Sequence, residues 1–367
     1  MAVAEFPAAV ADEIHMPTAA TPAVFLARIY FGVLSLLALG SFVFGVENRF
    51  AADALLPVAP PVDLIPPLTA RDWSLAFVNH QQDPLFAACG GAVSLAHFKV
   101  LYWWEWLRQA SLIALAGGAT IGLVGASVWR RFRFVFPRLG VLAGLAFFYW
   151  IAGVAVELAV NQIGALSRLN TGQYRHAVEV TLASAAVAAV LAATVKPLRS
   201  AGAAPSHRGD RSEWLWIAVI LVDIGFGGLF AARNAAAFWS TWPGYEGGVL
   251  PPLGQLVSYS PWWLNFTFNP YTIQLVHRAL SGAIWIVALG QLVSSALRAD
   301  RSKRDLVRFL LITGQMLTGV ATLVLGVPAA LSMIHQIGAI FLLAASLVFL
   351  TGVSACQRSR PTDFGIA

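Results

Sequence analysis

The chain has 367 residues, of which 58% are hydrophobic and only 11% are charged, and its formal net charge is +6 at pH 7. Soluble domains contain roughly 45–50% apolar and about 25% charged residues, so this composition excludes a soluble globular protein. It also excludes a disordered chain, because 12% aromatic residues supply ample apolar surface for burial. The composition predicts an integral membrane protein.

The positive charge does not indicate nucleic-acid binding. Membrane proteins concentrate Lys and Arg in their cytoplasmic loops and become basic for that reason alone. No basic run of this sequence is interleaved with exposed aromatic residues, as nucleic-acid binding requires. We therefore expect no nucleic-acid partner.

Eight apolar segments are long enough to cross a bilayer. A spanning helix needs about 20 mostly apolar residues. Such segments occupy residues 25–46, 100–128, 138–161, 174–195, 213–234, 270–297, 305–327 and 329–354. The sequence therefore predicts an all-α integral membrane protein with eight transmembrane helices.

Basic residues alternate between the connections of these segments. Lys and Arg gather after the second, fourth and sixth segments, whereas loops 47–99 and 235–269 are long and poor in them. By the positive-inside rule, the basic loops and both termini are cytoplasmic and the long loops face outward. The basic residues that indicate this orientation are Arg130, Arg131, Arg133, Arg138, Lys196, Arg199, Arg208, Arg211, Arg298, Arg301, Lys303, Arg304 and Arg308. Cys89 and Cys356 then lie on opposite sides of the membrane, so we expect no disulfide between them.

The chain also repeats itself. Each half has one apolar segment, then a long outer loop with a Pro-Pro-Leu sequence at 66–68 or 251–253, then three more segments. This order predicts two tandem, pseudo-symmetric four-helix bundles, spanning residues 1–195 and 213–367. Residues 196–212, which contain Gly, Pro, Ser and charges, are predicted to form a cytoplasmic linker.

Two histidines lie inside predicted spans of the second half. His277 is about seven residues into segment 270–297 and His335 about six residues into segment 329–354, so both lie roughly 10 Å below the outer surface. Ionisable residues within spans are costly and are candidates for function. Two imidazoles at one depth could ligate one haem iron between them. The alternative is two unrelated histidines that are hydrogen-bonded to neighbouring polar groups.

The equivalent positions of the first half hold Arg108 and Glu179. Arginine has no lone pair for iron, so we expect an ion pair between these residues, which would fill the space of a second haem. Glu105, three residues before Arg108, is either a second partner of that arginine or a carboxylate that handles protons. His176, one turn from Glu179, and His97 are the candidates for a replacement ligand.

Two further acidic residues, Glu157 and Asp223, fall inside predicted spans. No spacing assigns either of them a chemical task. We expect both to satisfy polar groups of neighbouring helices rather than to react.

The same residues resemble a known family, the haem A synthases of alphaproteobacterial and mitochondrial type. The run from Pro66 to Phe77 resembles that family's outer loop, and residues 94–106 are similar to its second-helix signature, with His97 where the family usually has Glu. In the second half, His277-Arg278 and His335-Gln336 stand in the family's most specific contexts. The similarity spans almost the whole chain.

The resemblance implies a haem b held by His277 and His335 in the C-terminal bundle and a haem O bound in the N-terminal bundle. There the methyl group of haem O would be oxidised to the formyl of haem A for cytochrome oxidase, with Glu105 matching the family's glutamate near the substrate. The chain would be an oxidoreductase of the cell inner membrane. Its partners would be membrane lipid, haem O synthase and cytochrome oxidase assembly proteins, with a homo-oligomer as one option.

The sequence also departs from the family where the substrate should bind. Arg108 and Glu179 stand where the family has its two N-terminal histidines, and Asn234 stands at the position of an aspartate. These departures define an alternative function: a non-catalytic b-haem-binding paralogue, serving as an electron-transfer subunit or assembly factor, whose N-terminal site is closed by the Arg108–Glu179 ion pair. A transporter of repeated bundles is a further alternative, and it predicts no haem.

Overall fold

The computed structural model describes residues 22–51, 63–82, 93–136, 138–144, 147, 151, 165–195, 207–245, 248, 250–298 and 303–351. Seven helices in these ranges are long and apolar enough to cross a membrane, and they correspond to seven of the eight predicted spans. The other predicted span, 138–161, lies largely outside the described residues and stays a prediction. Glu157, Cys89 and Cys356 also lie outside them.

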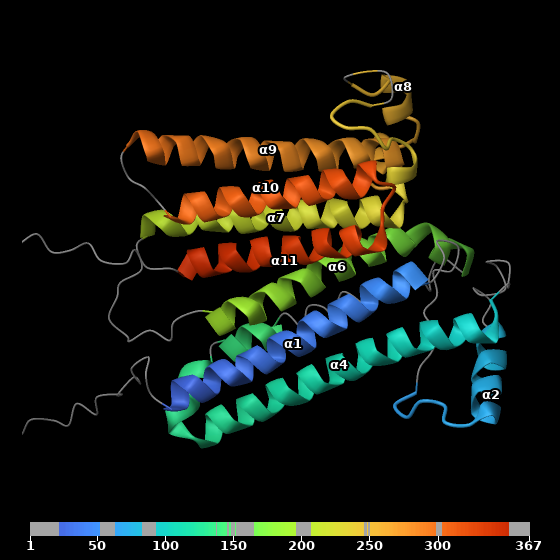
Figure 1. The fold of residues 1–367 in the computed structure, drawn as a ribbon, viewed down its shortest axis with the longest axis vertical. Helices are drawn as coiled ribbons and strands as arrows, with labels where there is room; N and C mark the ends of the chain where they lie inside the picture. The colour runs from blue at the N-terminus through green and yellow to red at the C-terminus, as the bar shows by residue number, and fades with distance from the viewer. Residues whose placement is uncertain are drawn as a thin grey trace, which may run out of the picture.

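All regular elements of the described residues are helical. The long ones are α1 (Pro22–Ala51), α4 (Leu95–Val128), α6 (Ala165–Val195), α7 (His207–Ala232), α9 (Pro270–Leu297), α10 (Lys303–Val324) and α11 (Ala329–Thr351). The short ones are α2 (Ala70–Gln81), α8 (Leu253–Leu256) and the 3-10 turns η1 (Arg130–Val135), η2 (Ala235–Ala237) and η3 (Trp262–Phe266). The long helices run side by side, whereas α2 lies across their ends (Figure 1).

Capping residues determine where two of the long helices begin. The side chain of Asn269 accepts a hydrogen bond from the backbone N–H of Tyr271 at 3.0 Å, and Pro270 occupies the first helical position of α9. Ser94 caps α4 in the same way, accepting from the N–H of His97 at 3.2 Å. These caps fix where α4 and α9 begin, and the distance from that start sets the depth of each polar side chain along the helix.

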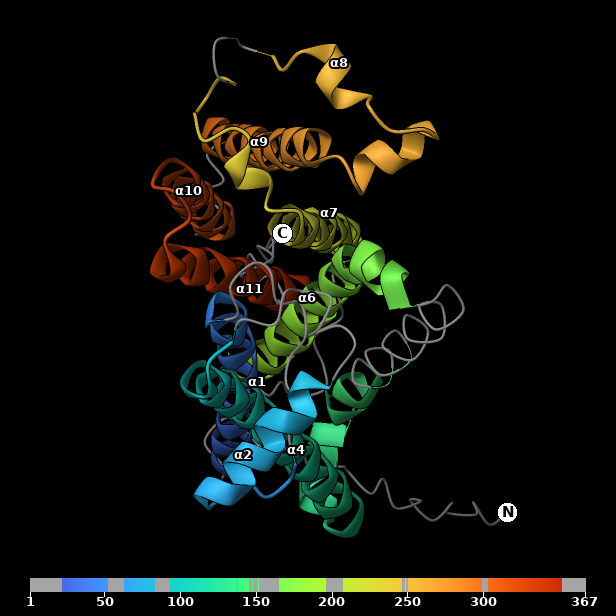
Figure 2. The ribbon, with the colours of Figure 1, turned by 90° about the vertical axis from the view of Figure 1, so that its right-hand side faces the viewer.

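Four helices of the C-terminal half surround one interior. Helix α7 contacts α9 and α11, and α10 contacts the same two helices, so α9 and α11 face each other across the bundle (Figure 2). These four helices form one bundle, whereas the predicted division of the chain into domains 1–195 and 213–367 stays a prediction. A pseudo-symmetric counterpart in the first half stays a prediction, because residues 152–164 are not described.

Helix α6 joins the two halves, since it contacts α1 on one side and α7 and α11 on the other. At Gly228 of α7, an added side chain would place its Cβ only 2.8 Å from the Cα of Ala177 on α6. Small residues of this kind let spanning helices approach closely where lipid removes the hydrophobic driving force. A shared apolar core continues the contact between the halves, and it includes Phe42, Val187, Ile220, Ile284, Ile340 and Leu343.

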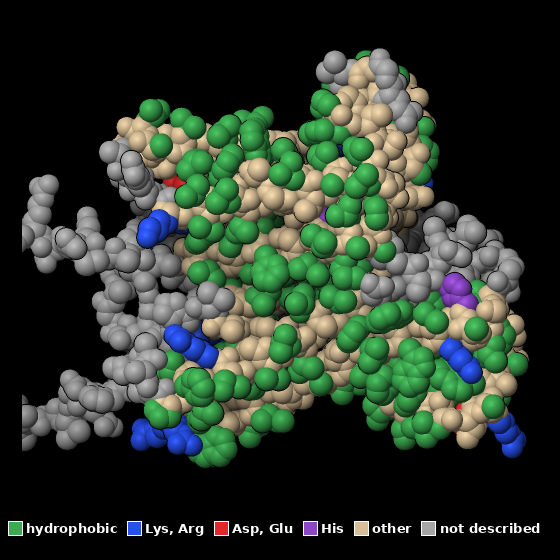
Figure 3. Space-filling view, in the orientation of Figure 1, with side chains coloured by type: hydrophobic (Ala, Val, Ile, Leu, Met, Phe, Trp, Pro, Cys, Tyr) green, Lys and Arg blue, Asp and Glu red, His purple; other side chains and the backbone are tan. Residues whose placement is uncertain are grey.

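Apolar side chains cover the middle of the molecular surface. In Figure 3 they spread over the long helices, whereas Lys and Arg gather at the end where α9 finishes and beside α2. Many large apolar side chains in this region are exposed, among them Leu36, Ile121, Ile286 and Leu317. An apolar band bounded by charge is the surface of a multi-pass membrane protein.

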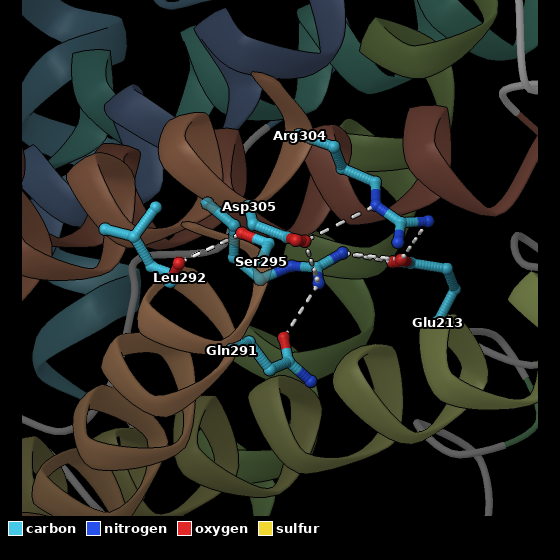
Figure 4. A network of polar contacts seen from close by, with 7 residues as sticks. Glu213, Gln291, Leu292, Ser295, Arg304 and Asp305 are labelled. Carbon is cyan, nitrogen blue, oxygen red and sulfur yellow. Dashed lines mark hydrogen bonds and ion pairs between the residues drawn. The ribbon is translucent and has the colours of Figure 1, made fainter. Parts of the chain in front are cut away.

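A buried ionic network joins the helices of the C-terminal bundle at the end opposite η2 (Figure 4). Arg308, only 2% exposed, donates to both oxygens of Glu213 at 2.6 and 2.5 Å and to Gln291 at 3.3 Å. Its guanidinium also lies 4.9 Å from the ring centroid of Trp216. The assignment of Arg308 to the loop charges is therefore wrong, because Glu213 provides a buried counter-charge inside the bundle.

Candidate functional site

The two histidines predicted as axial ligands lie on the facing helices α9 and α11. His277 is seven residues beyond Pro270, and His335 is six residues beyond Ala329. Both helices begin at the same end of the bundle (Figure 1), so at 1.5 Å per residue both histidines lie about 10 Å below that end. The structure thus places the pair at one depth on facing helices, which is the arrangement that ligation of one haem between them requires.

A carboxylate orients the ring of His277. Its Nδ1 lies 2.8 Å from Oδ1 of Asp223 on α7, and the other carboxylate oxygen accepts a hydrogen bond from Ser281 at 2.9 Å. The carboxylate lies on the Nδ1 side of the ring, so Nε2 is the nitrogen left for another partner.

Neutral groups orient the ring of His335. Its Nδ1 lies 3.2 Å from the carbonyl oxygen of Gln315 and 3.3 Å from the hydroxyl of Thr318, both on α10. The side-chain amide of Gln315 in turn donates to the carbonyl of His335 at 2.8 Å. An Nδ1–H donated to the carbonyl leaves Nε2 of this histidine as the basic nitrogen too.

Each imidazole also rests on a glycine of a neighbouring helix. A Cβ added at Gly319 of α10 would lie 2.8 Å from Cε1 of His335, and one added at Gly227 of α7 would lie 3.5 Å from Cε1 of His277. Gly227 and Gly319 each stand five residues before the last residue of their helix. The rings therefore occupy matching cradles on α7 and α10.

Two oriented imidazoles on facing helices fit the axial positions of a haem iron. The described residues hold no group of three or more His, Cys, Asp or Glu that could bind a free metal ion. A porphyrin supplies the remaining iron ligands itself, so the two histidines suffice for a haem.

The loop between α7 and α9 is hydrogen-bonded to side chains of α9 at this end of the bundle. Gln274, which is fully buried, donates to the carbonyl of Trp239 at 2.7 Å, and Arg278 donates to the same carbonyl at 3.1 Å. The guanidinium of Arg278 lies 4.6 Å from the ring centroid of Tyr245. Burial raises the pKa of the Tyr245 hydroxyl while the nearby Arg278 lowers it, and burial is the larger effect. The phenol therefore stays neutral in this loop at physiological pH.

The first half presents an ion pair in place of imidazoles. Glu105, only 4% exposed, accepts from Nε of Arg108 at 2.8 Å and also from Nη2 of the same side chain. Gln109 donates to the same carboxylate at 3.0 Å. The structure therefore confirms Glu105 as a partner of Arg108. Helix α1 packs against this arginine, because a Cβ added at Gly45 would lie 3.1 Å from its Cδ.

The other residues predicted for this half lie on two helices. Glu179 is partly buried on α6, and His176 is buried one turn before it. His97 lies in the first turn of α4. The Arg108–Glu179 ion pair and a ligand role for either histidine stay predictions.

Sequence reasoning missed the residues that orient the two imidazoles. Asp223 could be recognised as an ionisable residue inside a span, and its contacts with His277 and Ser281 agree with the expectation that it satisfies a neighbouring helix. Its role as the group that orients His277 was not predicted. The sequence held one weak sign that Gly227 and Gly319 are equivalent, because each stands five residues before the last residue of its helix.

Comparison with known proteins identifies relatives over most of the chain. Residues 60–347 match the family model described as "Cytochrome oxidase assembly protein". The chain is 29% identical over 348 residues to the haem A synthase of Rhodopseudomonas palustris (strain BisA53), with 91% of both chains covered. It is 29% identical over 338 residues to that of Sinorhizobium fredii (strain NBRC 101917 / NGR234), covering 89% of this chain and 88% of the relative. For the haem A synthase of Chelativorans sp. (strain BNC1), the identity is 31% over 291 residues, covering 76% and 77%. No solved structure matches the chain.

Proposed function

Since this chain belongs to the haem A synthase family, we propose that its C-terminal bundle holds a b-type haem between His277 and His335. One observation carries this proposal: both imidazoles lie at one depth on facing helices, and each has its Nδ1 beside an oxygen atom and so presents Nε2. When bound, the haem would supply one-electron exchange. Asp223, Gln315 and the two glycine cradles would hold the imidazoles in place.

The proposed activity is the oxidation of the haem O methyl group to the formyl of haem A, in the service of cytochrome oxidase biogenesis. The N-terminal half, residues 1–195, would bind the haem O. Glu105 would lie near the substrate and handle protons, with Arg108 as its counter-charge. The buried position of Glu105 on α4 and its contact with a cation support this assignment.

We assign the chain to the cell inner membrane, with both termini and the linker 196–212 in the cytoplasm and residues 213–367 forming the haem b half. The basic residues between the spans support this orientation. Haem O synthase and cytochrome oxidase assembly proteins would then be partners, because the first would supply the substrate and the second would receive the product.

Extraction of haems tests the activity. The chain is expressed in a host that makes haem O and lacks its own haem A synthase, and the membrane haems are separated by chromatography. We expect haem A with the wild type and with Asp305→Asn, a control at the opposite end of the C-terminal bundle, and none with Glu105→Gln. A wild type that leaves haem O unconverted would refute the proposed oxidation.

The Arg108–Glu105 ion pair favours a second candidate function, the non-catalytic b-haem-binding paralogue. An arginine on the helix that should carry a haem ligand gives this half no donor for iron at that position. In this case the same experiment yields no haem A, while the purified protein still carries haem b and loses it on His277→Ala. The two outcomes separate an enzyme from a haem-binding subunit or assembly factor.

A further inference from the structure

The two imidazoles of the C-terminal bundle differ in the charge of the group beside Nδ1. His277 faces the carboxylate of Asp223 at 2.8 Å, whereas His335 faces a backbone carbonyl at 3.2 Å and a hydroxyl at 3.3 Å. A glycine lies against each ring, more closely at His335 than at His277, and the group beside Nδ1 adds a difference of charge.

The fold holds this carboxylate in place from two helices. Asp223 stands four residues before Gly227 on α7, so both lie on the helix face that meets the ring of His277. Ser281 stands four residues after His277 on α9 and donates to the second carboxylate oxygen at 2.9 Å. The nearby cation, Arg278, directs its guanidinium toward the carbonyls of Trp239 and Gly244. Asp223 thus holds its negative charge beside Nδ1 of His277 rather than beside an arginine.

We propose that Asp223 is a positioning residue that lowers the reduction potential of the haem bound by His277 and His335. A carboxylate 2.8 Å from Nδ1 increases the basicity of the imidazole through its negative charge and makes Nε2 a stronger donor. A stronger donor favours the ferric over the ferrous state of the iron, and the low dielectric of the bundle interior enlarges the effect of the charge. His277 becomes the more electron-rich of the two ligands, because only its partner beside Nδ1 carries a charge. This inference rests on the haem site proposed above.

Redox titration of the purified, haem-loaded protein at a fixed pH tests the inference. We expect Asp223→Asn to raise the midpoint potential relative to wild type and to alter the resonance Raman signature of the iron–imidazole bonds. Asp223→Glu should restore part of the shift, because it returns the carboxylate. The matched control is Asp305→Asn, which removes one negative charge from the same bundle at its opposite end. A shift in Asp223→Asn no larger than in this control would overturn the inference.

A second variant decides the matter if Asp223→Asn does not retain haem. Ser281→Ala keeps the carboxylate but removes its hydrogen-bond donor, so more of its negative charge should act on His277 and the potential should fall. An unchanged or raised potential in Ser281→Ala would overturn the inference. Failure of the underlying haem site would look different, because the wild type would then contain no haem b that depends on His277.

Discussion

The two halves of this chain use buried charge in opposite ways. In the first half, Arg108 and Glu105 satisfy each other within one helix, three residues apart. In the second half, helices α9 and α11 carry His277 and His335, whose partners come from two other helices, α7 and α10. An arginine has no lone pair to offer iron, whereas imidazoles held on the Nδ1 side by other helices keep Nε2 for a ligand bond.

If the proposed haem site is right, orientation by neighbouring helices is what would distinguish a ligand here from a merely buried histidine. A histidine that satisfied itself on its own helix would stabilise the bundle and bind nothing. In the C-terminal bundle, the groups that contact the two rings lie on other helices: the Asp223 carboxylate and Gly227 on α7, and the Gln315 carbonyl and Gly319 on α10. The site therefore depends on how the four helices pack.

The largest expected effect comes from filling one glycine cradle. In Gly319→Ala the new Cβ would lie 2.8 Å from Cε1 of His335, so the ring must move, and we expect most of the bound haem to be lost. Gly314→Ala is the matched control, because no atom lies within 4 Å of its added Cβ on the same helix. Gly227→Ala, with ordinary contact at 3.5 Å, should retain haem. The haem-to-protein absorbance ratio measures all three variants, and equal ratios in Gly319→Ala and Gly314→Ala would contradict the proposed cradle.

The next effect would come from making the first half resemble the second. In Arg108→His/Glu179→His, two imidazoles replace the charged residues at the family's ligand positions, and we expect the haem content to rise above that of the wild type. Arg108→His alone should not produce the increase, because a single imidazole supplies one axial ligand. Pyridine haemochrome spectra give the content, and an unchanged value in the double variant would show that the halves differ in more than these side chains.

A smaller effect separates the two ion pairs by their burial. Glu213→Gln leaves the buried Arg308 with only the carboxylate of Asp305, 4.0 Å away, so we expect unfolding to become easier by about 3 kcal/mol. Glu105→Gln should cost only about 1 kcal/mol, because the side chain of Arg108 is 27% exposed and reaches water. Unfolding midpoints in detergent compare the two variants, and similar losses would contradict the assigned difference in burial.

The smallest effect concerns the N-terminal cap of helix α2 in the first half. At the start of α2 the carboxylate of Asp72 accepts from the backbone N–H of Thr69, and the backbone N–H of Asp72 donates to the hydroxyl of Thr69. Hydrogen bonding with the side chain and backbone of Thr69 lowers the pKa of the Asp72 carboxyl group. Since the folded-state pKa lies below the unfolded one, the contribution of this cap is complete above the unfolded pKa of about 3.9 and is lost as the pH falls through the folded value. Hydrogen exchange at the first turn of α2, corrected for intrinsic rates, should be flat from neutral pH to about pH 5 and should rise in more acid solution. In Asp72→Asn this rise should be absent.

The sequence predicted the features that follow directly from residue position along the chain, which are the spans and the depth of the two histidines. Apolar length gave the seven described spans, and the distance from each helix start gave the depth of His277 and His335. It could not predict which helix faces bring Asp223 to His277 or Gly319 to His335, because these contacts depend on how α7 and α10 rotate against their neighbours. Arg308 was misplaced for the same reason, since its partner Glu213 lies 95 residues away in the chain.

The decisive experiment for the C-terminal haem site is the haem content of the purified wild type, set beside His277→Ala and His335→Ala. His207→Ala, which changes a histidine at the first residue of α7, serves as the control. We expect one haem b per chain in the wild type and in the control, and its loss from either ligand variant. A haem b that persists at full content in both His277→Ala and His335→Ala would contradict the proposed ligation.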